Sequence, residues 1–385
     1  MTALSVETPS YVTEELRIFE VAVAKFLDRE ATPNLERYLA QHGVDRALWS
    51  KAGQAGLLCA SIPESYGGAG GSFAHEAVII EQLGMRGIDA WGLPLHNAIV
   101  APYILHYGSE EQKHKWLPRL ASGELVGAIA MTEPGAGSDL QGVKTAARRD
   151  GNHYVINGSK TFVTNGGSAN FIIVVAKTNF SQRARGISLV CLETDDLEGF
   201  RRGRVLDKIG QKINDTAELF FDDIRVPTSN LIGVEEGMGF IQLMQQLPQE
   251  RLIIALQAMA MIERALAETT AYVKERRAFG RAIIEFQNTQ LKLAACKTDA
   301  MIAKVFSQYC VDLHLRGRLD APVASMAKLW LTEKQCEIVD ECLQLHGGYG
   351  YMTEYPIARM YADSRVQRIY GGTSEIMKLL IARSL

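Results

Sequence analysis

The chain has 385 residues, of which 47% are hydrophobic and 22% charged, and 41 basic against 44 acidic side chains leave a formal net charge of −3. This composition is typical of folded globular domains and excludes intrinsic disorder as a general description. A small negative charge also excludes a global basic field for nucleic acid or an anionic membrane. At this length we expect two or three folding units, or one with large insertions.

The N-terminal third is predicted to be helical. From Thr13 to about Ser122, apolar residues recur with the period of an amphipathic helix. The segment 63–68, PESYGG, interrupts this pattern, because proline fixes its φ angle and glycine adopts conformations that other residues avoid. We therefore expect an N-terminal helical domain over residues 1–122, with a loop at 63–68.

The pattern changes between residues 123 and 233 to short runs of β-branched and aromatic residues. Turn-forming dipeptides, Asp-Gly once and Asn-Gly twice, separate the runs at 150–151, 157–158 and 165–166. We expect a small antiparallel sheet or barrel, so that residues 123–233 form a middle β domain. The runs expected to be strands are 153–156, 171–176, 186–192 and 218–221.

Helical periodicity returns after residue 238. The segments 238–275, 289–315 and 323–345 are longer than average globular helices, which predicts that they pack side by side as a bundle within a C-terminal domain, 234–385. Pro248 lies within the first segment, where its ring and missing N–H predict a kink or a restart of the helix. The order of helices, strands and helices indicates an α+β fold that is mainly α.

The six cysteines are widely spaced, without the CxxC or His spacing of zinc sites, and we expect them to be core residues in a reducing compartment. No apolar run approaches the roughly 18 residues of a bilayer span. The first residues are unlike a secretory signal, and the last do not match a peroxisomal address. The sequence therefore predicts a cytoplasmic protein with no membrane span, nucleic-acid partner or metal site.

Five segments could carry chemistry, and the first is 130–140, AMTEPGAGSDL. Its glycines and proline let the backbone approach a ligand, and Thr132 and Ser138 supply hydroxyl groups for a polar edge or a phosphate. It is neither a Walker loop, since no Gly-Lys-Ser/Thr follows, nor a Rossmann fingerprint. The alternative is an ordinary surface loop next to a strand.

The second segment, 160–167, reads KTFVTNGG and predicts a strand that runs into a turn, where Thr164 could serve β-propensity alone. The third, 275–281, ends a long helix with three arginines around Phe279. A plain cap explains any one arginine, because cations are favourable at a helix C-terminus. Together, however, the arginines could grip a pyrophosphate and stack on a ring.

The fourth segment, 344–351, reads QLHGGYGY, and a helix cap explains one of its three glycines but hardly all of them. The others permit close approach to a helix or to a nucleotide. The fifth, 368–376, reads RIYGGTSEI, so that Thr373 can cap the last helix and Glu375 falls in its first turn. A helix N-terminus also attracts anions, so capping and anion binding both stay open here.

Together TEPGAGSD, TNGG, RxAFG, the glycine cluster and YGGTSEI, in this order and at these separations, resemble the acyl-CoA dehydrogenase family of flavoenzymes. The resemblance covers the chain from about Tyr11 to Leu385. It implies an N-terminal helical domain, a middle β domain and a C-terminal four-helix bundle. It also implies FAD as cofactor, an acyl-CoA thioester as substrate and a homotetramer built as a dimer of dimers.

The resemblance further implies roles for individual residues. Many members have Trp where this chain has Phe162. Groups such as Arg276 and Gln344 would reach the adenosine and pyrophosphate of FAD across the dimer interface, so a monomer would hold FAD incompletely. The FAD contacts implied are Ile129, Met131, Thr132, Ser138, Phe162, Thr164, Arg276, Phe279, Gln287, Gln344, Gly347, Gly348, Thr373 and Glu375. The substrate contacts implied are Ser138, Leu247, Arg251, Tyr370, Gly371 and Gly372.

The catalytic base implied by the resemblance is Glu250. In many members a Glu follows the Tyr of the last motif, but here that position is Gly371. A minority, notably the long-chain and isovaleryl-type enzymes, place the Glu before an Arg on a bundle helix, and 249–251, QER, is most similar to the long-chain type. A carboxylate between a proline kink and an apolar helix face would be partly desolvated, which raises its pKa toward that of a general base. The alternative is a solvated Glu paired with Lys or Arg.

The resemblance thus implies FAD-dependent α,β-dehydrogenation of a fatty acyl-CoA to a trans-2-enoyl-CoA. Glu250 would remove the α-proton, a hydride would pass to flavin N5, and the Gly371 N–H would help to hold the enolate oxygen. Electrons would then pass to an electron-transferring flavoprotein. Long straight acyl chains are the first expectation, since Gly371 frees space and 92–94, GLP, could loosen a helix at the acyl pocket.

Three alternatives stay open from the sequence. Medium-chain or branched acyl groups could be the substrate of the same reaction. A flavin oxidase or monooxygenase could use the same fold with oxygen in place of the flavoprotein acceptor. A helical binding protein that has lost catalysis is the alternative of a different class, although the presence of both a candidate base and the full flavin-binding set argues against it.

Overall fold

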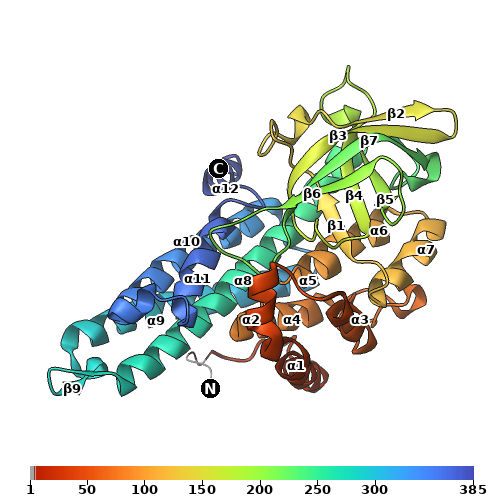
Figure 1. Cartoon of the computed structure of the whole chain (residues 1–385). Coiled ribbons are helices and arrows are strands. Elements are labelled where there is room, and N and C mark those ends of the chain that lie inside the picture. The colour runs from red at the N-terminus through yellow and green to blue at the C-terminus, as the bar shows by residue number, and fades with distance from the viewer. Residues whose placement is uncertain (1–3, 5) are drawn as a thin grey trace.

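The computed structural model describes residue 4 and residues 6–385 (Figure 1). The sheet lies at one end of the molecule, the long helices α8, α9 and α10 extend away from it, and the N-terminal helices pack beside both. The N-terminal helices and the sheet share one cluster of buried apolar side chains. A second cluster lies mainly among the long helices and also includes Phe73 and Ile80 of α4. The expected α+β fold, mainly α, is confirmed.

The N-terminal part is helical, as the apolar periodicity predicts. Thr13 caps α1 and Ser109 caps α7, because each hydroxyl accepts a hydrogen bond from a backbone N–H of the first turn. The loop expected at 63–68 contains one 3-10 turn, Glu64–Tyr66. The α-helices are α1 (Glu14–Phe26), α2 (Leu35–Gln41), α3 (Arg46–Gln54), α4 (Phe73–Arg86), α5 (Leu93–Leu95), α6 (Ala101–Tyr107) and α7 (Glu110–Ala121).

A π-helical turn, His96–Val100, separates α5 from α6. Such a turn inserts one residue into the helical path and so rotates the side chains that follow it relative to those that precede it. The segment begins just after 92–94, where the sequence predicts a loosened helix. The rotation decides which side chains α6 presents to α8.

The middle part is a seven-stranded sheet with strand order β1-β4-β2-β3-β7-β6, and β5 pairs with β4 as well. All four runs expected to be strands are confirmed, and the turns expected at 150–151 and 165–166 follow strands as predicted. The strands are β1 (Gly127–Ala130), β2 (Ala146–Asp150), β3 (His153–Val163), β4 (Phe171–Lys177), β5 (Ile187–Glu193), β6 (Phe200–Val205) and β7 (Ala217–Pro227).

Two details of the sheet differ from expectation. The sheet is not purely antiparallel, since β1 and β2 each pair with β4 in parallel. The turn expected at 157–158 is wrong: this Asn-Gly pair lies inside β3, where the register against β7 shifts. Gly158 is needed there, because its φ is 151° and a Cβ would come within 2.5 Å of the Oγ1 atom of Thr145.

The C-terminal part contains three long helices, with α11 and α12 packed against α10. Of the kink or restart expected at Pro248, the restart is wrong, because α8 continues through this residue. The buried apolar stretch that follows Pro248 packs into the core, and this packing outweighs the lost backbone hydrogen bond. The elements are α8 (Gly239–Glu275), β8 (Arg277–Ala278), β9 (Arg281–Ala282), α9 (Gln287–Leu315), α10 (Ala321–Leu345), α11 (Pro356–Ser364) and α12 (Ser374–Ala382).

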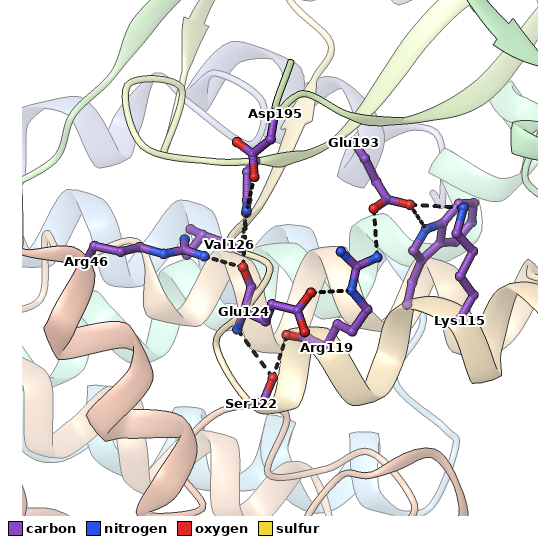
Figure 2. Close-up of polar contacts among 10 residues, drawn as sticks. Arg46, Lys115, Arg119, Ser122, Glu124, Val126, Glu193 and Asp195 are labelled. Atoms are coloured by element: carbon purple, nitrogen blue, oxygen red, sulfur yellow. Dashed lines mark hydrogen bonds and ion pairs between the residues drawn. The ribbon is translucent and has the colours of Figure 1, made fainter. Parts of the chain in front are cut away.

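A polar cluster joins α7 to β5 and to the turn before β1 (Figure 2). The Glu193 carboxylate accepts hydrogen bonds from Trp116 Nε1 at 3.0 Å and Arg119 Nη1 at 2.7 Å, and it pairs with Lys115 at 2.9 Å. Arg119 also bonds Glu124 at 2.7 Å. Burial alone would raise the pKa of Glu193, but these three donors outweigh it and lower the pKa to about 2.

The buried side chain of Asn165 joins the N-terminal helices to the sheet. Its Nδ2 atom donates to the carbonyl oxygens of Gly92, at 3.1 Å, and Gly127, at 3.0 Å. Gly92 lies before α5 and Gly127 begins β1, whereas Asn165 lies in the turn after β3. A Cβ atom at Gly92 would overlap the Asn165 amide, so the close approach requires glycine at that position.

All six cysteines are free thiols, and five are buried while Cys336 is half-buried, as expected for core residues. None of the helices in the described part of the chain is long and apolar enough to cross a bilayer. Residues 4 and 6–385 also contain no group of three or more His, Cys, Asp or Glu side chains that could hold a metal ion.

Candidate active site

Glu250 lies inside α8 with only 6% of its surface exposed. Its Oε1 atom accepts a hydrogen bond of 2.8 Å from the hydroxyl of Tyr103, a fully buried residue of α6. Burial raises the pKa of Glu250 to about 7, although the Tyr103 hydrogen bond and the charge of Arg251 act in the opposite direction. The carboxyl is therefore buried rather than solvated, and it exchanges its proton near neutral pH.

The neighbouring Arg251 is also buried and points toward α10. Its Nη1 atom donates to the hydroxyl of Ser325 at 3.3 Å, while its Nε atom has no hydrogen-bond partner among the described residues. Burial lowers the pKa of Arg251, and Glu250 partly offsets this effect. Glu250 and Arg251 thus form a buried pair of opposite charges on one turn of α8.

Gly371 lies beside the face of α8 that carries Glu250. Ile254 follows Glu250 by one helical turn, so the two side chains share a face. A Cβ atom at Gly371 would overlap the Cδ1 atom of Ile254, and Gly371 has a φ of 67°. The glycine is therefore required both by its backbone conformation and by its closeness to α8.

The next residue, Gly372, is held by a buried lysine. Its carbonyl oxygen accepts a hydrogen bond of 2.7 Å from Lys328 Nζ, and Lys328 of α10 has no exposed surface. Burial, and then the positive charge of Arg251, lowers the pKa of Lys328 to about 8, while Glu333 acts in the opposite direction. The 371–372 turn is thereby tied to the same part of α10 that contacts Arg251.

Thr373 caps α12, and its Oγ1 atom accepts a hydrogen bond from Ile376 N at 3.3 Å. Glu375 is exposed in the first turn of α12, where its backbone N–H and the Thr373 hydroxyl lower the pKa of its carboxyl. Tyr370 and Leu247 are half-buried. The capping expected of Thr373 is confirmed, and the helix N-terminus lies directly after the 371–372 turn.

The loop after β1 is joined to β3 through its backbone. The carbonyl oxygen of Met131 accepts a hydrogen bond from Lys160 Nζ at 2.9 Å, and that of Thr132 accepts one from Thr161 N at 2.9 Å. Ile129 is buried in β1, whereas Ser138 is exposed further along the loop. The loop and β3 thus lie side by side, as a shared ligand surface requires.

A buried ion pair supports this loop. Glu133 Oε1 lies 2.9 Å from Lys160 Nζ and accepts a hydrogen bond of 2.9 Å from Thr145 N, while Oε2 accepts one of 2.6 Å from Lys144 N. Burial alone would raise the pKa of Glu133, but the hydrogen bonds from Thr145 and Lys160 hold it below its ordinary value. Burial lowers the pKa of Lys160 to about 8.

Phe162 presents its ring to the surface at the end of β3. Its φ is 57°, an uncommon value for an aromatic residue, and 67% of its surface is exposed. Thr164 follows in the turn and is half-buried. An exposed aromatic ring on strained backbone beside a glycine-rich loop is an arrangement found at ligand sites.

The other expected FAD contacts lie at the far ends of the long helices, near β9 in Figure 1. The Arg276 guanidinium lies 5.4 Å from the centroid of the Tyr349 ring, and Phe279 is 95% exposed. A Cβ added at Gly347 or Gly348 would meet no atom within 4 Å. Gln287 and Gln344 are both exposed at this end of the molecule.

The structure thus brings the expected site residues together in two groups rather than one. The first group surrounds Glu250 and the sheet, and the second surrounds Arg276. Arg276 follows Glu250 by 26 residues, which corresponds to about 39 Å of helix. Phe279 lies between β8 and β9, at the end of the long helices opposite the sheet, so one copy of the chain does not bring it to the loop that holds Thr132 (Figure 1).

Three features of the site were not predicted from the sequence: the Tyr103 hydrogen bond, the Lys328 contact and the Glu133–Lys160 ion pair. Tyr103 is 147 residues from Glu250 and belongs to no motif, so no local signal indicates it. Lys328 does have a signal. It occupies the apolar face of α10 between buried residues, where a lone lysine indicates a specific partner.

Three family models match the chain: "Acyl-CoA dehydrogenase, N-terminal domain" over residues 13–124, "Acyl-CoA dehydrogenase, middle domain" over 128–224, and "Acyl-CoA dehydrogenase, C-terminal domain" over 237–385. The chain belongs to the acyl-CoA dehydrogenase family. It is therefore an oxidoreductase of the class that acts on CH–CH bonds, and the expected family is confirmed. Family members are FAD flavoproteins of fatty acid β-oxidation, so the expected cofactor is confirmed as well.

Individual acyl-CoA dehydrogenases are similar over nearly the whole chain. The long-chain specific acyl-CoA dehydrogenase, mitochondrial, of Sus scrofa is 50% identical over 375 residues, covering 97% of this chain and 87% of the relative. The crystal structure of acyl-CoA dehydrogenase from Geobacillus kaustophilus is 47% identical, with a TM-score of 0.95 over 98% of this chain and 99% of that one. A glutaryl-CoA dehydrogenase from Mycobacterium smegmatis in complex with FADH2 is 29% identical, with a TM-score of 0.89 over 98% and 96%.

The exposed groups of this acyl-CoA dehydrogenase fit FAD chemically. Phe162 and Phe279 offer exposed rings on which a flavin or an adenine can stack. Arg276 offers a cation for the pyrophosphate, and the open backbone at Gly347 and Gly348 permits close approach. These groups lie at two ends of one chain (Figure 1).

Proposed function

We propose that this chain dehydrogenates a long-chain acyl-CoA at its α and β carbons, giving a trans-2-enoyl-CoA, with Glu250 as the base that removes the α-proton. The observation that carries this proposal is a buried carboxyl with a pKa of about 7, beside a glycine turn whose backbone faces the same part of α8. A base with this pKa is half ionised at neutral pH, the condition under which proton transfer is most effective.

FAD, when bound, accepts the hydride that leaves the β-carbon. Glu250 takes the α-proton, and the electron pair of the broken C–H bond becomes the new carbon–carbon double bond. The backbone N–H of Gly371 stabilises the negative charge that develops on the thioester oxygen. Lys328 keeps the 371–372 turn in place, and the apolar surroundings of Glu250 exclude water, which strengthens both interactions.

We assign Thr132, Ser138, Phe162 and Thr164 to the flavin side of the site and Thr373 to its edge. The backbone pairing of Thr132 with β3 and the exposed Phe162 ring support this assignment. The other proposed FAD contacts on this side are Ile129, Met131 and Glu375. The proposed substrate contacts are Ser138, Leu247, Arg251, Tyr370, Gly371 and Gly372.

We propose a homotetramer in which Arg276, Phe279, Gln287, Gln344, Gly347 and Gly348 contact the FAD of a neighbouring subunit. The separation of about 39 Å along α8 supports contributions from two copies. The proposed domains, 1–122, 123–233 and 234–385, are supported by the three family models, whose matches are separated near the same positions.

The proposed electron acceptor is an electron-transferring flavoprotein, a partner in keeping with family membership. The proposed location is cytoplasmic. The relative from Sus scrofa is named mitochondrial, so fractionation of cells that express this chain decides between the two compartments.

A series of straight acyl-CoA thioesters, scored anaerobically by loss of the flavin absorbance, tests the proposed substrate. We expect the fastest bleaching with palmitoyl-CoA or longer chains, in keeping with the long-chain specificity in the name of the Sus scrofa relative. Faster bleaching by octanoyl-CoA or isovaleryl-CoA would assign a medium-chain or branched substrate instead. Rapid reoxidation by air after bleaching would indicate an oxidase.

A substitution of the proposed base tests the chemistry directly. The variant Glu250→Gln keeps the shape of the side chain and its contact with Tyr103 but cannot accept a proton. We expect it to retain FAD and to lose at least about 10³-fold in the rate of flavin reduction. A variant that reduces its flavin at the wild-type rate would remove Glu250 from the role of base.

A further inference from the structure

We propose that Tyr103 is the positioning residue of the catalytic base: its hydroxyl holds the Glu250 carboxylate in one orientation and favours the ionised form that accepts the α-proton. This inference rests on the proposed role of Glu250 as the base. It adds a residue of the N-terminal helices to a reaction otherwise assigned to the sheet, the flavin and the C-terminal helices.

The contact is short, buried and specific. The Tyr103 hydroxyl lies 2.8 Å from Glu250 Oε1, and Tyr103 has no exposed surface. In the described part of the chain, no other side chain donates a hydrogen bond to this carboxyl. Arg251 follows Glu250 in sequence, yet its guanidinium bonds Ser325 instead. Tyr103 is therefore the donor that fixes the direction of the carboxylate.

Three more hydrogen bonds join α8 to α6 and to the π-helical turn that precedes it, on either side of this contact. Gln249 Nε2 donates to the carbonyl oxygen of Ala98 at 2.6 Å. The Tyr107 hydroxyl donates to Gln245 Oε1 at 3.0 Å and accepts a hydrogen bond from Gln246 Nε2 at 3.2 Å. The Tyr103 hydroxyl is thus braced by polar contacts on both sides, which keep α6 and α8 at a fixed separation.

The π-helical turn before α6 explains why Tyr103 faces α8. Within this turn, His96 accepts a hydrogen bond from Gly127 N, and Asn97 bonds the backbone near Leu57, so both side chains point away from α8. The residue inserted by the turn rotates α6 relative to them and directs Tyr103 toward Glu250. π-helical turns are frequent at functional sites, and here the turn has a definite geometric result.

The charged and titratable groups that act on Glu250 are Tyr103 and Tyr107 from α6 and Arg251 from α8. A hydrogen bond donated to a carboxylate stabilises its charged form, because the donor replaces a water that burial has removed. Without the Tyr103 hydroxyl, burial would act with less opposition, so the pKa of Glu250 would rise further. The carboxyl would also lose the contact that fixes its orientation.

The test compares holoenzymes with Tyr103→Phe, Tyr154→Phe and Glu250→Gln. Tyr154 is the matched control, because the hydroxyl of its buried side chain likewise donates a hydrogen bond to a carboxylate, Glu236 at 2.6 Å, which belongs to the segment before α8 and does not contact Glu250. Flavin reduction by palmitoyl-CoA is measured anaerobically by stopped flow across a range of pH. We expect the rising limb of the rate profile to move upward by roughly 1–2 pH units in Tyr103→Phe, and not in Tyr154→Phe.

A second measurement needs no catalysis. Infrared titration of the holoenzyme without substrate follows the band of the protonated carboxyl that Glu250→Gln lacks. Its midpoint should lie near pH 7 in the wild type and above that in Tyr103→Phe. A fluorinated tyrosine at position 103, whose hydroxyl is a stronger donor in an unchanged shape, should move the midpoint downward. This variant covers the case in which Tyr103→Phe folds poorly.

The outcomes separate the inference from the proposed function. If Glu250→Gln reduces its flavin normally, the proposed base is wrong and the role of Tyr103 is lost with it. If Glu250→Gln is inactive but both the rate profile and the infrared midpoint of the Tyr103 variants match the wild type, only the inference about Tyr103 is overturned. Equal shifts in the Tyr103 and Tyr154 variants would also overturn it, because they would reflect a general loss of stability.

Discussion

The ammonium group of Lys328 lies 2.7 Å from the carbonyl oxygen of Gly372, at a position with no access to solvent. A buried cation is costly unless it has a partner, and here the partner is the backbone of the turn that carries Gly371. The charged group of Lys328 therefore holds one peptide unit of the 371–372 turn in place.

We expect Lys328→Met to retain FAD and to reduce it roughly 10- to 100-fold more slowly than the wild type, because small displacements of a reacting geometry cause losses of this size. Methionine fills similar space but leaves the Gly372 carbonyl without its donor. Stopped-flow bleaching with a saturating acyl-CoA measures the rate. The control is Lys334→Met on the same helix, which removes only partly exposed ion pairs and should reduce flavin normally.

A methyl group at position 371 should impair both the fold and the reaction. Gly371→Ala places a Cβ against Ile254 Cδ1 and strains a backbone with a φ of 67°. We expect a loss of about 1–3 kcal/mol in unfolding free energy and a slower flavin reduction. The double variant with Ile254→Val removes the clashing carbon, so part of the rate should return.

The control Gly317→Ala distinguishes the effect of backbone strain at position 371 from the effect of the close contact with Ile254. Gly317 also has a positive φ, 65°, but a Cβ there meets no atom within 4 Å. Thermal unfolding should show a loss of about 1 kcal/mol from the backbone alone, with normal flavin reduction. Equal rates in Gly371→Ala and the wild type would contradict a close packing of the 371–372 turn on α8.

The Glu193 cluster predicts a specific loss of stability in acid. The pKa of Glu193 is about 2 in the fold, below the ordinary value of 4.5, so its stabilising effect is fully present above pH 4.5 and is lost as the pH falls toward 2. Since the side chain is about a third exposed, solvent screening limits the effect to about 1 kcal/mol. The gap in melting temperature between the wild type and Glu193→Gln should therefore narrow from pH 7 to pH 3.

Glu218→Gln is the control for this acid effect, because the Glu218 side chain is as exposed as that of Glu193 but has a single long ion pair among the described residues, with the exposed Arg204 at 3.4 Å. Its melting temperature should follow the wild type at both pH values. A Glu193 variant whose deficit stays constant between pH 7 and pH 3 would show that lost packing, rather than charge, is responsible.

A variant at Phe279 tests whether a second copy of the chain completes the FAD site. Phe279→Ala removes a side chain that is 95% exposed in one copy, so the fold of the subunit should be unchanged. We expect the purified variant to contain less than half as much FAD per subunit as the wild type. We also expect its proposed tetramer to dissociate more readily in size-exclusion chromatography. Phe180→Ala removes another exposed ring, 61% exposed, and should change neither quantity. Full flavin content in Phe279→Ala would argue against a contact between subunits.

The elements of the fold could be predicted well from the sequence because their signals are local. The long helices follow from apolar periodicity, and the cap of α12 follows from Thr373. The Asn-Gly pair at 157–158 is a strong hairpin signal, but here it serves a bulge that the approach of Thr145 demands. A packing partner so distant in sequence cannot be seen in a local pattern. The parallel pairings of β4 were missed for the same reason.

The residues of the candidate site differ in the same way, since some belong to a local motif and others act through tertiary contacts. Glu250 could be proposed because it stands in a recognisable segment, 249–251, followed by an apolar stretch. Tyr103 could not, because its relation to Glu250 depends on a π-helical turn and on the docking of α6 against α8. The groups that tune a site through tertiary contacts carry no signature of their own in one sequence.

The Asn165 amide couples the unfolding of the N-terminal helices to that of the sheet. The Asn165 Nδ2 atom donates hydrogen bonds to the carbonyl oxygens of Gly92, just before α5, and Gly127, at the start of β1. Separating the N-terminal helices from the sheet would break these hydrogen bonds and leave buried polar atoms without partners. The two regions should therefore exchange their amide hydrogens with deuterium in a single cooperative step rather than in sequence. In the variant Asn165→Ala, the helices and the sheet should exchange in two separate steps, and partly unfolded species should be detectable by mass spectrometry.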